Sequence, residues 1–133
     1  MTDTPSTKCH HTLHPNGIHE FSIVDSSMAS AEAYMQELEK IYRLRTPDSP
    51  PLHILFDAGV GTLPISFTMQ RGKALAAKYP NVGMILIATL TDRMVEIRIV
   101  DSFMRVIRLP NTRLRFFGLS RRDDAINWLL QDD

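Results

Sequence analysis

Apolar and polar positions alternate along this chain with a spacing that switches several times between strand and helix. Two segments that flank the turn Pro15-Asn16-Gly17 alternate with period two and predict a β-hairpin. Two later segments are almost wholly apolar, as expected of strands covered on both faces. The predicted strands cover residues 9–14, 18–24, 52–57, 84–90 and 114–117.

Four other segments repeat apolar residues at steps of three and four, which predicts helices. Ser27 or Ser30 is expected to cap the first helix and Ser120 the last, because a serine side chain accepts a hydrogen bond from a free backbone N–H group. Residues 92–109 include five that alternate like a strand, but helical spacing fits the whole segment and places Ile99 toward the core. The predicted helices cover residues 30–45, 65–79, 92–109 and a segment after residue 120.

The predicted elements follow one another as β-β-α-β-α-β-α-β-α. This alternation predicts an α/β fold with a mainly parallel central sheet of about five strands, four helices and an antiparallel hairpin at one edge. A length of 133 residues fits one domain, expected to cover residues 9–133 after a disordered tail at residues 1–8. No apolar run approaches the ~20 residues that cross a bilayer, and no signal segment is recognisable, so a cytoplasmic location is expected.

Net charge is zero, but arginine is concentrated in one stretch. Eight arginines lie between Arg93 and Arg122, accompanied there by the acidic residues Glu96 and Asp101. Such a stretch is typical of an anion-binding face or of a solvated surface with local ion pairs. The second interpretation is favoured, because these arginines are interleaved with core positions.

The N-terminal segment combines Cys9, His10, His11, His14 and His19, which are residue types that bind zinc. Because neighbouring side chains of a strand point to opposite faces, Cys9, His11 and His19 could converge while His10 points away. A polar edge hairpin explains the same pattern and is favoured. We therefore expect no metal and no other cofactor, and a single cysteine forms no internal disulfide.

The predicted strand Leu52–Asp57 opens into the loop Ala58-Gly59-Val60-Gly61. This loop lacks both the lysine of a phosphate-binding loop and the third glycine of a dinucleotide fingerprint. The carboxyl ends of parallel strands are where α/β folds place ligands, so Asp57, Gly59 and Gly61 are predicted to form a ligand or partner loop. No Gly-x-Ser-x-Gly elbow is present. Asp57 has no evident catalytic partner and is expected to accept backbone N–H bonds, so no catalytic residue is expected.

The order, length and spacing of these elements resemble the STAS domain of bacterial anti-sigma-factor antagonists, and more closely the stand-alone SpoIIAA-like domains of the STAS/SEC14 kind. The resemblance covers residues 18 to 130 and rests on topology and apolar pattern. In the antagonist family, helix two opens with Asp-Ser-Ser-Gly, whose second serine is phosphorylated by the partner kinase. That tetrad falls here on Pro64-Ile65-Ser66-Phe67, so only the acceptor serine matches.

The resemblance implies a non-enzymatic regulatory domain that binds another protein or a second copy of itself, switched near the start of helix two. A phosphate on Ser66, Thr62 or Thr68 would lie near the free N–H groups of that helix, which makes these hydroxyls the predicted phosphoacceptor or anion site. A carrier of small apolar molecules or lipids, like SEC14-type relatives, is the alternative, and a small enzyme using Asp57 is a third. No nucleic-acid partner and no membrane span is expected. Sulfur-containing and aromatic residues that would suit a carrier are Met69, Met94, Phe103, Met104, Phe116 and Phe117.

Overall fold

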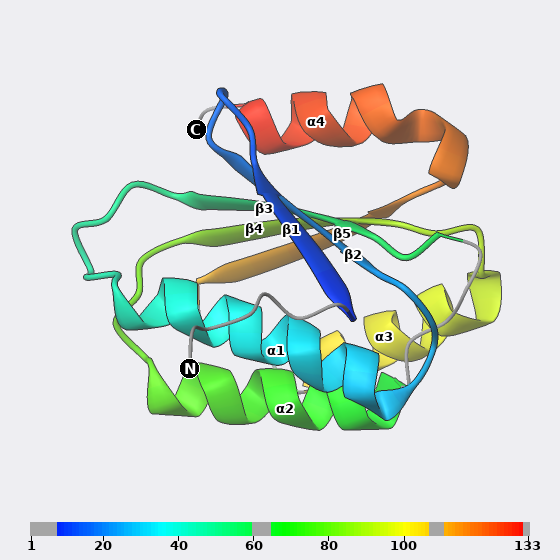
Figure 1. Cartoon of the computed structure of the whole chain (residues 1–133), viewed down its shortest axis with the longest axis horizontal. Coiled ribbons are helices and arrows are strands. Elements are labelled where there is room, and N and C mark those ends of the chain that lie inside the picture. Colours follow the sequence, from blue (N-terminus) through cyan, green and yellow to red (C-terminus); the bar gives the residue numbers. More distant parts are fainter. Residues whose placement is uncertain (1–7, 60–64, 107–110, 132–133) are drawn as a thin grey trace.

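The computed structural model describes residues 8–59, 65–106 and 111–131. A five-stranded sheet lies between three helices on one face and one helix on the other (Figure 1). The prediction of an α/β fold with a mostly parallel five-stranded sheet and four helices is confirmed. In chain order the elements are β1 (Cys9–Leu13), β2 (Ile18–Ile23), α1 (Met28–Arg43), β3 (Leu52–Asp57), α2 (Ile65–Lys78), β4 (Ile85–Leu90), α3 (Met94–Val106), β5 (Thr112–Phe117), a 3-10 turn (Leu119–Arg121) and α4 (Arg122–Leu130).

The strands lie side by side in their order along the chain, from β1 to β5. β1 pairs with β2 antiparallel, whereas β2, β3, β4 and β5 pair in parallel. Each parallel strand is added on the same side of the one before it. Right-handed crossovers then place α1, α2 and α3 on one face of the sheet, and α4 is left to cover the opposite face (Figure 1).

The core has two parts because helices cover both faces of the sheet. Ile54 and Phe56 of β3 belong to the part under α1 and α2, whereas Leu55 packs with Ala125 and Leu129 of α4. All five residues are at most 2% exposed. A strand buried on both faces must be apolar at successive positions, which explains why β3 reads as a continuous apolar run.

Helix α1 begins at a network of small polar side chains. Ser27 is its N-cap, and its Oγ accepts a hydrogen bond from the backbone N–H of Ser30 at 3.1 Å. Asp25 Oδ1 accepts from the backbone N–H of Ser27 at 3.0 Å and from Ser30 Oγ at 2.6 Å. Of the two predicted caps, Ser27 is therefore the one used. The hydrogen bonds from Ser27 and Ser30 also lower the pKa of Asp25.

The predicted cap of the last helix is wrong. Ser120 lies inside the 3-10 turn, and α4 starts after Arg121, which makes no side-chain capping bond. The chain is held before α4 by Asp92 instead, whose Oδ1 accepts from the backbone N–H of Leu119 at 3.0 Å. The side chain of Asp92, 27 residues away, thus binds the backbone at the start of the 3-10 turn that leads into α4.

Two other expectations differ from the structure. Ile99 of α3 is 49% exposed, while its neighbour Val100 takes the inner position at 6%. Lys8, expected in a disordered tail, is paired: its carbonyl accepts from the N–H of Val24 at 3.1 Å. Residues 1–7 lie outside the described part of the chain. Within the part described, no helix is both long and apolar enough to cross a membrane.

Candidate functional site

A cavity of about 140 Å³ lies between the sheet and the helices α1, α2 and α3. Strands β3, β4 and β5 form one wall, α1 and α2 form the other, and Val100 comes from α3. Among the described residues that line it, none carries a charged side chain, and most are apolar. The cavity is therefore suited to an uncharged occupant.

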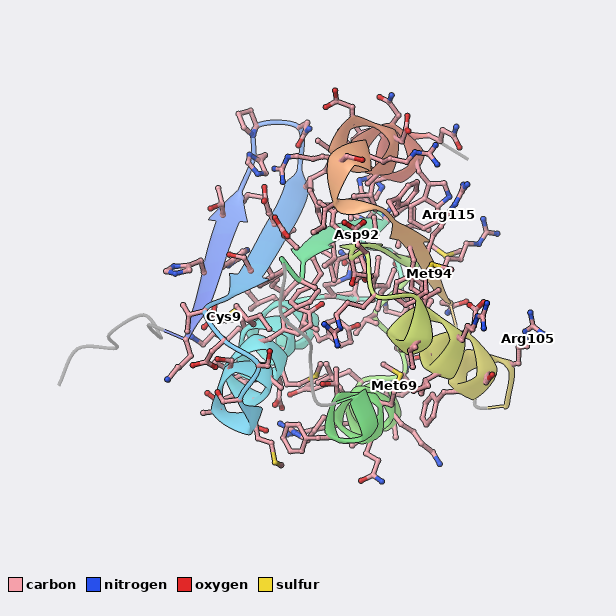
Figure 2. The ribbon with its side chains drawn as sticks, turned by 90° about the vertical axis from the view of Figure 1, so that its right-hand side faces the viewer. Cys9, Met69, Asp92, Met94, Arg105 and Arg115 are labelled. Atoms are coloured by element: carbon pink, nitrogen blue, oxygen red, sulfur yellow. The ribbon has the colours of Figure 1, made fainter. Side chains whose placement is uncertain are left out.

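Small residues on the inner face of α2 leave this space open. Gly72 and Ala76 line the cavity at adjacent turns of the helix. A Cβ atom added at Gly72 would meet no atom within 4 Å, apart from the near backbone of its own helix. Protein interiors are otherwise close-packed, so the cavity marks the place where α2 does not fill the gap above the sheet. Met69, one turn before Gly72, is labelled on the same helix in Figure 2.

The α1 side of the cavity carries two tyrosines, Tyr34 and Tyr42, which are 5% and 7% exposed. The Tyr34 ring stacks on Phe56 with 4.5 Å between centroids, and the Tyr42 ring meets Tyr79 edge-on at 6.4 Å. Burial raises the pKa of Tyr42 to about 12 and raises that of Tyr34 still further. Both phenols are therefore neutral at physiological pH.

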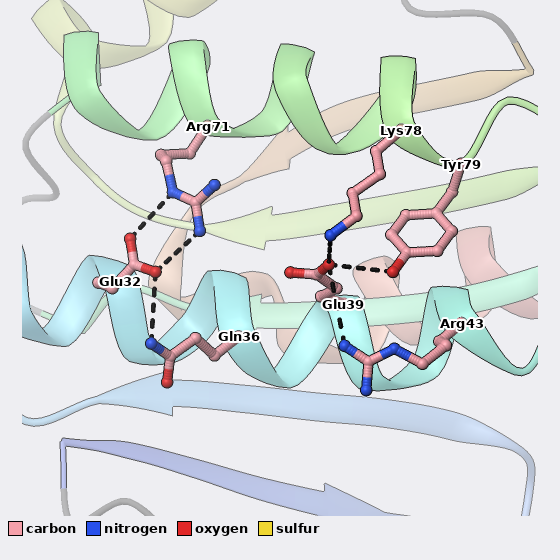
Figure 3. Close-up of polar contacts among 7 residues, drawn as sticks. All are labelled: Glu32, Gln36, Glu39, Arg43, Arg71, Lys78 and Tyr79. Atoms are coloured by element: carbon pink, nitrogen blue, oxygen red, sulfur yellow. Dashed lines mark hydrogen bonds and ion pairs between the residues drawn. The ribbon is translucent and has the colours of Figure 1, made fainter.

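Two groups of ionic contacts join α1 to α2 (Figure 3). Arg71 donates to both carboxylate oxygens of Glu32, from Nε at 2.9 Å and from Nη2 at 2.8 Å. Glu39 accepts from Lys78 Nζ at 2.7 Å and from Tyr79 Oη at 3.0 Å. These bonds lower the pKa of both glutamates and hold the two helical walls of the cavity together.

Comparison with known proteins adds no further guide to this site. No family model, no curated protein and no solved structure matches the chain. The resemblance to STAS domains therefore stays a prediction, and the function has to be inferred from the geometry of the chain itself.

The predicted ligand loop begins at Asp57, the last residue of β3. Asp57 Oδ1 accepts the backbone N–H of Gly59 at 2.8 Å, and Gly59 adopts a φ of 62°, where glycine is favoured. Asp57 thus accepts a backbone N–H bond in the loop, as the sequence predicts. Gly61 lies outside the described residues, so the ligand loop stays a prediction.

Of the three predicted phosphoacceptors, only Thr68 has a side chain in the described part of the structure. Ser66 is the second residue of α2 and so lies in its first turn, as predicted, although its side chain is outside the described part of the structure. Thr62 also lies outside it. Thr68 is 5% exposed and lines the cavity, so in the folded domain its hydroxyl is not accessible to a kinase.

Of the residues considered as candidate metal ligands, His11 and His19 meet, but Cys9 does not join them. His11 Nε2 lies 3.0 Å from His19 Nδ1, and the His11 ring stacks on Phe21 with 4.4 Å between centroids. Cys9 packs into the core, where burial raises the pKa of its thiol to about 11. Over the described ranges, no group of three histidine, cysteine, aspartate or glutamate side chains could hold a metal ion. Burial lowers the pKa of both histidines, so a neutral hydrogen-bonded pair is favoured.

The arginine-rich stretch is spread over several surfaces. Arg122 of α4 donates from Nη1 to Glu20 Oε2 at 2.9 Å, and Glu20 also pairs with His14 at 2.7 Å. Figure 2 labels Arg105 on α3 and Arg115 on β5 at separate places, and the Arg115 guanidinium lies 5.0 Å from the centre of the Phe117 ring. These side chains support the interpretation as a solvated surface with local ion pairs.

Sequence reasoning missed the two tyrosines as site residues. Neither Tyr34 nor Tyr42 was among the predicted site residues. The available signal was a pair of tyrosines eight residues apart in an amphipathic helix, because a buried phenol needs a hydrogen-bond partner. Among the residues expected to suit a carrier, Met69 and Phe116 line the cavity, whereas Met94 is 59% exposed.

Proposed function

We propose that this domain binds a small apolar molecule in the cavity between the sheet and α1, α2 and α3. One observation supports the proposal: the space of about 140 Å³ between the sheet and the helices, lined mainly by apolar side chains and by no charged ones among the described residues. Unfilled volume in a core costs roughly 24 cal/mol per Å³, so an occupant of this space could recover on the order of 3 kcal/mol.

The volume also limits the size of the ligand. An engineered apolar cavity of ~150 Å³ in another protein stays dry and binds benzene, whereas pockets for drug-sized ligands measure roughly 300–1,000 Å³. A space of about 140 Å³ therefore suits one ring or a short chain. This favours a small-molecule binding module over a carrier of two-chain lipids.

Toluene is a suitable first probe, because it is apolar and has one ring. A ligand that binds only the folded state raises the free energy of unfolding by about 1.4 kcal/mol at ten times its Kd. We expect toluene to raise the Tm of the wild-type protein in scanning calorimetry. Gly72→Met should abolish this rise, because the new side chain points into the cavity and methionine adapts to irregular gaps.

Gly72→Ala is the matched control, since it adds only a methyl group at the same position and should keep the response to toluene. An unchanged Tm of the wild-type protein both in saturating toluene and in saturating phenol would refute the binding function. An equal rise in Gly72→Met would also refute it, because the site would then lie elsewhere.

A protein-interaction domain is the second candidate, supported by a separate observation on α3. Met94, Val95 and Ile99 are apolar yet 59%, 71% and 49% exposed. Such side chains could be covered by a second copy of the chain.

The mass measured by light scattering should then rise with protein concentration, and Val95→Glu should keep the mass at that of one chain. A single-chain mass at all concentrations would contradict self-association. If the start of α2 is a switch, Ser66→Asp should change the same mass.

A further inference from the structure

The cavity carries a more specific chemistry than apolarity alone. We propose that its ligand is an uncharged molecule with one hydrogen-bonding oxygen, such as a phenol, alcohol or ketone, held by the hydroxyl groups of Tyr34 and Tyr42. This inference rests on the proposed binding function and adds the class of ligand.

The two hydroxyl groups have no partner of their own. Within the described residues, neither Tyr34 Oη nor Tyr42 Oη makes a hydrogen bond, whereas Tyr79 Oη on the same cavity donates to Glu39 at 3.0 Å. Every fully enclosed side-chain nitrogen or oxygen in that part of the chain does have a partner. Neither hydroxyl is therefore fully enclosed by protein atoms, and both tyrosines line the cavity while being more than nine-tenths buried.

An unpaired polar group in such a place is costly. Leaving a buried hydroxyl without a hydrogen bond costs about 1–3 kcal/mol, and a phenol hydroxyl can both donate and accept. A ligand oxygen beside Tyr34 or Tyr42 would supply the missing bond, which toluene or another hydrocarbon cannot do. The site should therefore favour a ligand with one polar atom over its hydrocarbon analogue.

The same surroundings exclude a charged ligand. Both tyrosines stay neutral at physiological pH because burial raises their pKa. Arg45 lies near the Tyr42 end, but its Nε donates to Val82 O at 2.7 Å and its Nη2 to Pro50 O at 2.6 Å, and it does not line the cavity. Among the described residues that line the cavity, a carboxylate or ammonium group would lose its hydration without gaining an ionic partner.

Phenol and toluene test this inference, because they differ by a hydroxyl in place of a methyl group. Their affinities are measured by NMR titration for the wild-type protein, Tyr34→Phe, Tyr42→Phe and the double variant. A net hydrogen bond is worth about 1 kcal/mol, so the double variant should bind phenol roughly fivefold more weakly and toluene within twofold of the wild-type value. The single variants show how the two hydroxyls share the effect. Benzoate, the charged analogue, should not bind.

Tyr79→Phe is the matched control, because it removes a hydroxyl from the same cavity wall that already has a partner in Glu39. It should leave the affinity for phenol unchanged but lower the Tm. Tyr34→Phe and Tyr42→Phe should not lower the Tm, because each removes a hydroxyl that makes no hydrogen bond.

The outcomes separate the two proposals. If toluene and phenol bind but the double variant weakens neither, or if benzoate binds as tightly as phenol, the assigned ligand class is wrong while the binding function stands. If neither toluene nor phenol binds the wild-type protein, the binding function fails and the ligand class fails with it.

Discussion

Replacing Gly72 by alanine should stabilise this protein, although Gly72 lines a cavity. The residue lies in the middle of α2, and a Cβ atom placed there meets no atom within 4 Å besides its helix's near backbone. Glycine in a helix interior costs about 1 kcal/mol relative to alanine, mainly because the unfolded glycine chain has more freedom to lose. We therefore expect the free energy of unfolding to rise by about 1 kcal/mol, or the Tm by roughly 3–5 °C for a domain of this size.

Gly17→Ala is the control for this prediction, because it adds the same atoms at a site that is equally open. A Cβ atom at Gly17 also meets nothing within 4 Å, but Gly17 has a φ of 88°. A residue with a side chain loses roughly 1–2 kcal/mol in this left-handed region, so Gly17→Ala should destabilise the fold. Urea denaturation followed by circular dichroism measures both changes. A destabilised Gly72→Ala, or two changes of the same sign, would refute the reasoning.

The ion pair between Arg71 and Glu32, the cap of α1 by Ser27 and the pair of His11 and His19 allow further tests by urea denaturation. Arg71→Met should lower the free energy of unfolding by less than about 1 kcal/mol, and by less still in 1 M salt, because the side chains of Arg71 and Glu32 are 33% and 35% exposed. Ser27→Ala should cost about 1 kcal/mol through loss of the α1 cap. Stability should fall as the pH drops below the ordinary histidine value of 6.5, because the pKa values of His11 and His19 are lowered in the folded state and the unfolded chain binds protons first. His19→Gln should reduce this slope.

Matched variants separate these effects from general disturbance. Lys73→Met removes an exposed charge from the same helix as Arg71 and should change the free energy of unfolding little. An equal loss in Arg71→Met and Lys73→Met would show that the ion pair between Arg71 and Glu32 does not stabilise the fold. Ser27→Thr keeps a hydroxyl group and should restore most of what Ser27→Ala loses. His10→Gln alters an exposed neighbour of His11. If it reduces the pH dependence of the free energy of unfolding as much as His19→Gln does, the pair of His11 and His19 is not the cause of that dependence.

The bounds of the elements were predictable where local chemistry sets them. The strand predicted at residues 52–57 is β3 to the residue, because prolines precede it and its apolar run ends at Asp57 and a glycine loop. Ser27 was one of two predicted caps for the same local reason. The prediction that Ser120 caps the last helix was wrong, because Asp92, on the loop after β4, holds the chain before α4. A bond between residues so far apart leaves no local pattern.

Inward and outward positions were less predictable for α3. Helical spacing places Ile99 and Val100 next to each other on one apolar side, but only Val100 is buried. The reason is that α3 crosses over at the end of the sheet, between β4 and β5, where it has fewer elements to pack against. Amphipathic spacing shows that a helix has an apolar side, but how many of its apolar side chains become buried depends on the elements that pack against it.

The sequence by itself determined the order and type of the elements, because periods of 2 and 3.6 residues and the proline and glycine breaks are written in consecutive residues. Only the tertiary structure decided that a cavity exists. Its walls bring Tyr34, Gly72 and Phe116 together from three elements, and the space depends on how far each side chain reaches across the gap. Only the structure likewise showed that the hydroxyl groups of Tyr34 and Tyr42 make no hydrogen bond within the described residues, because a hydroxyl's surroundings are set by residues distant in the chain.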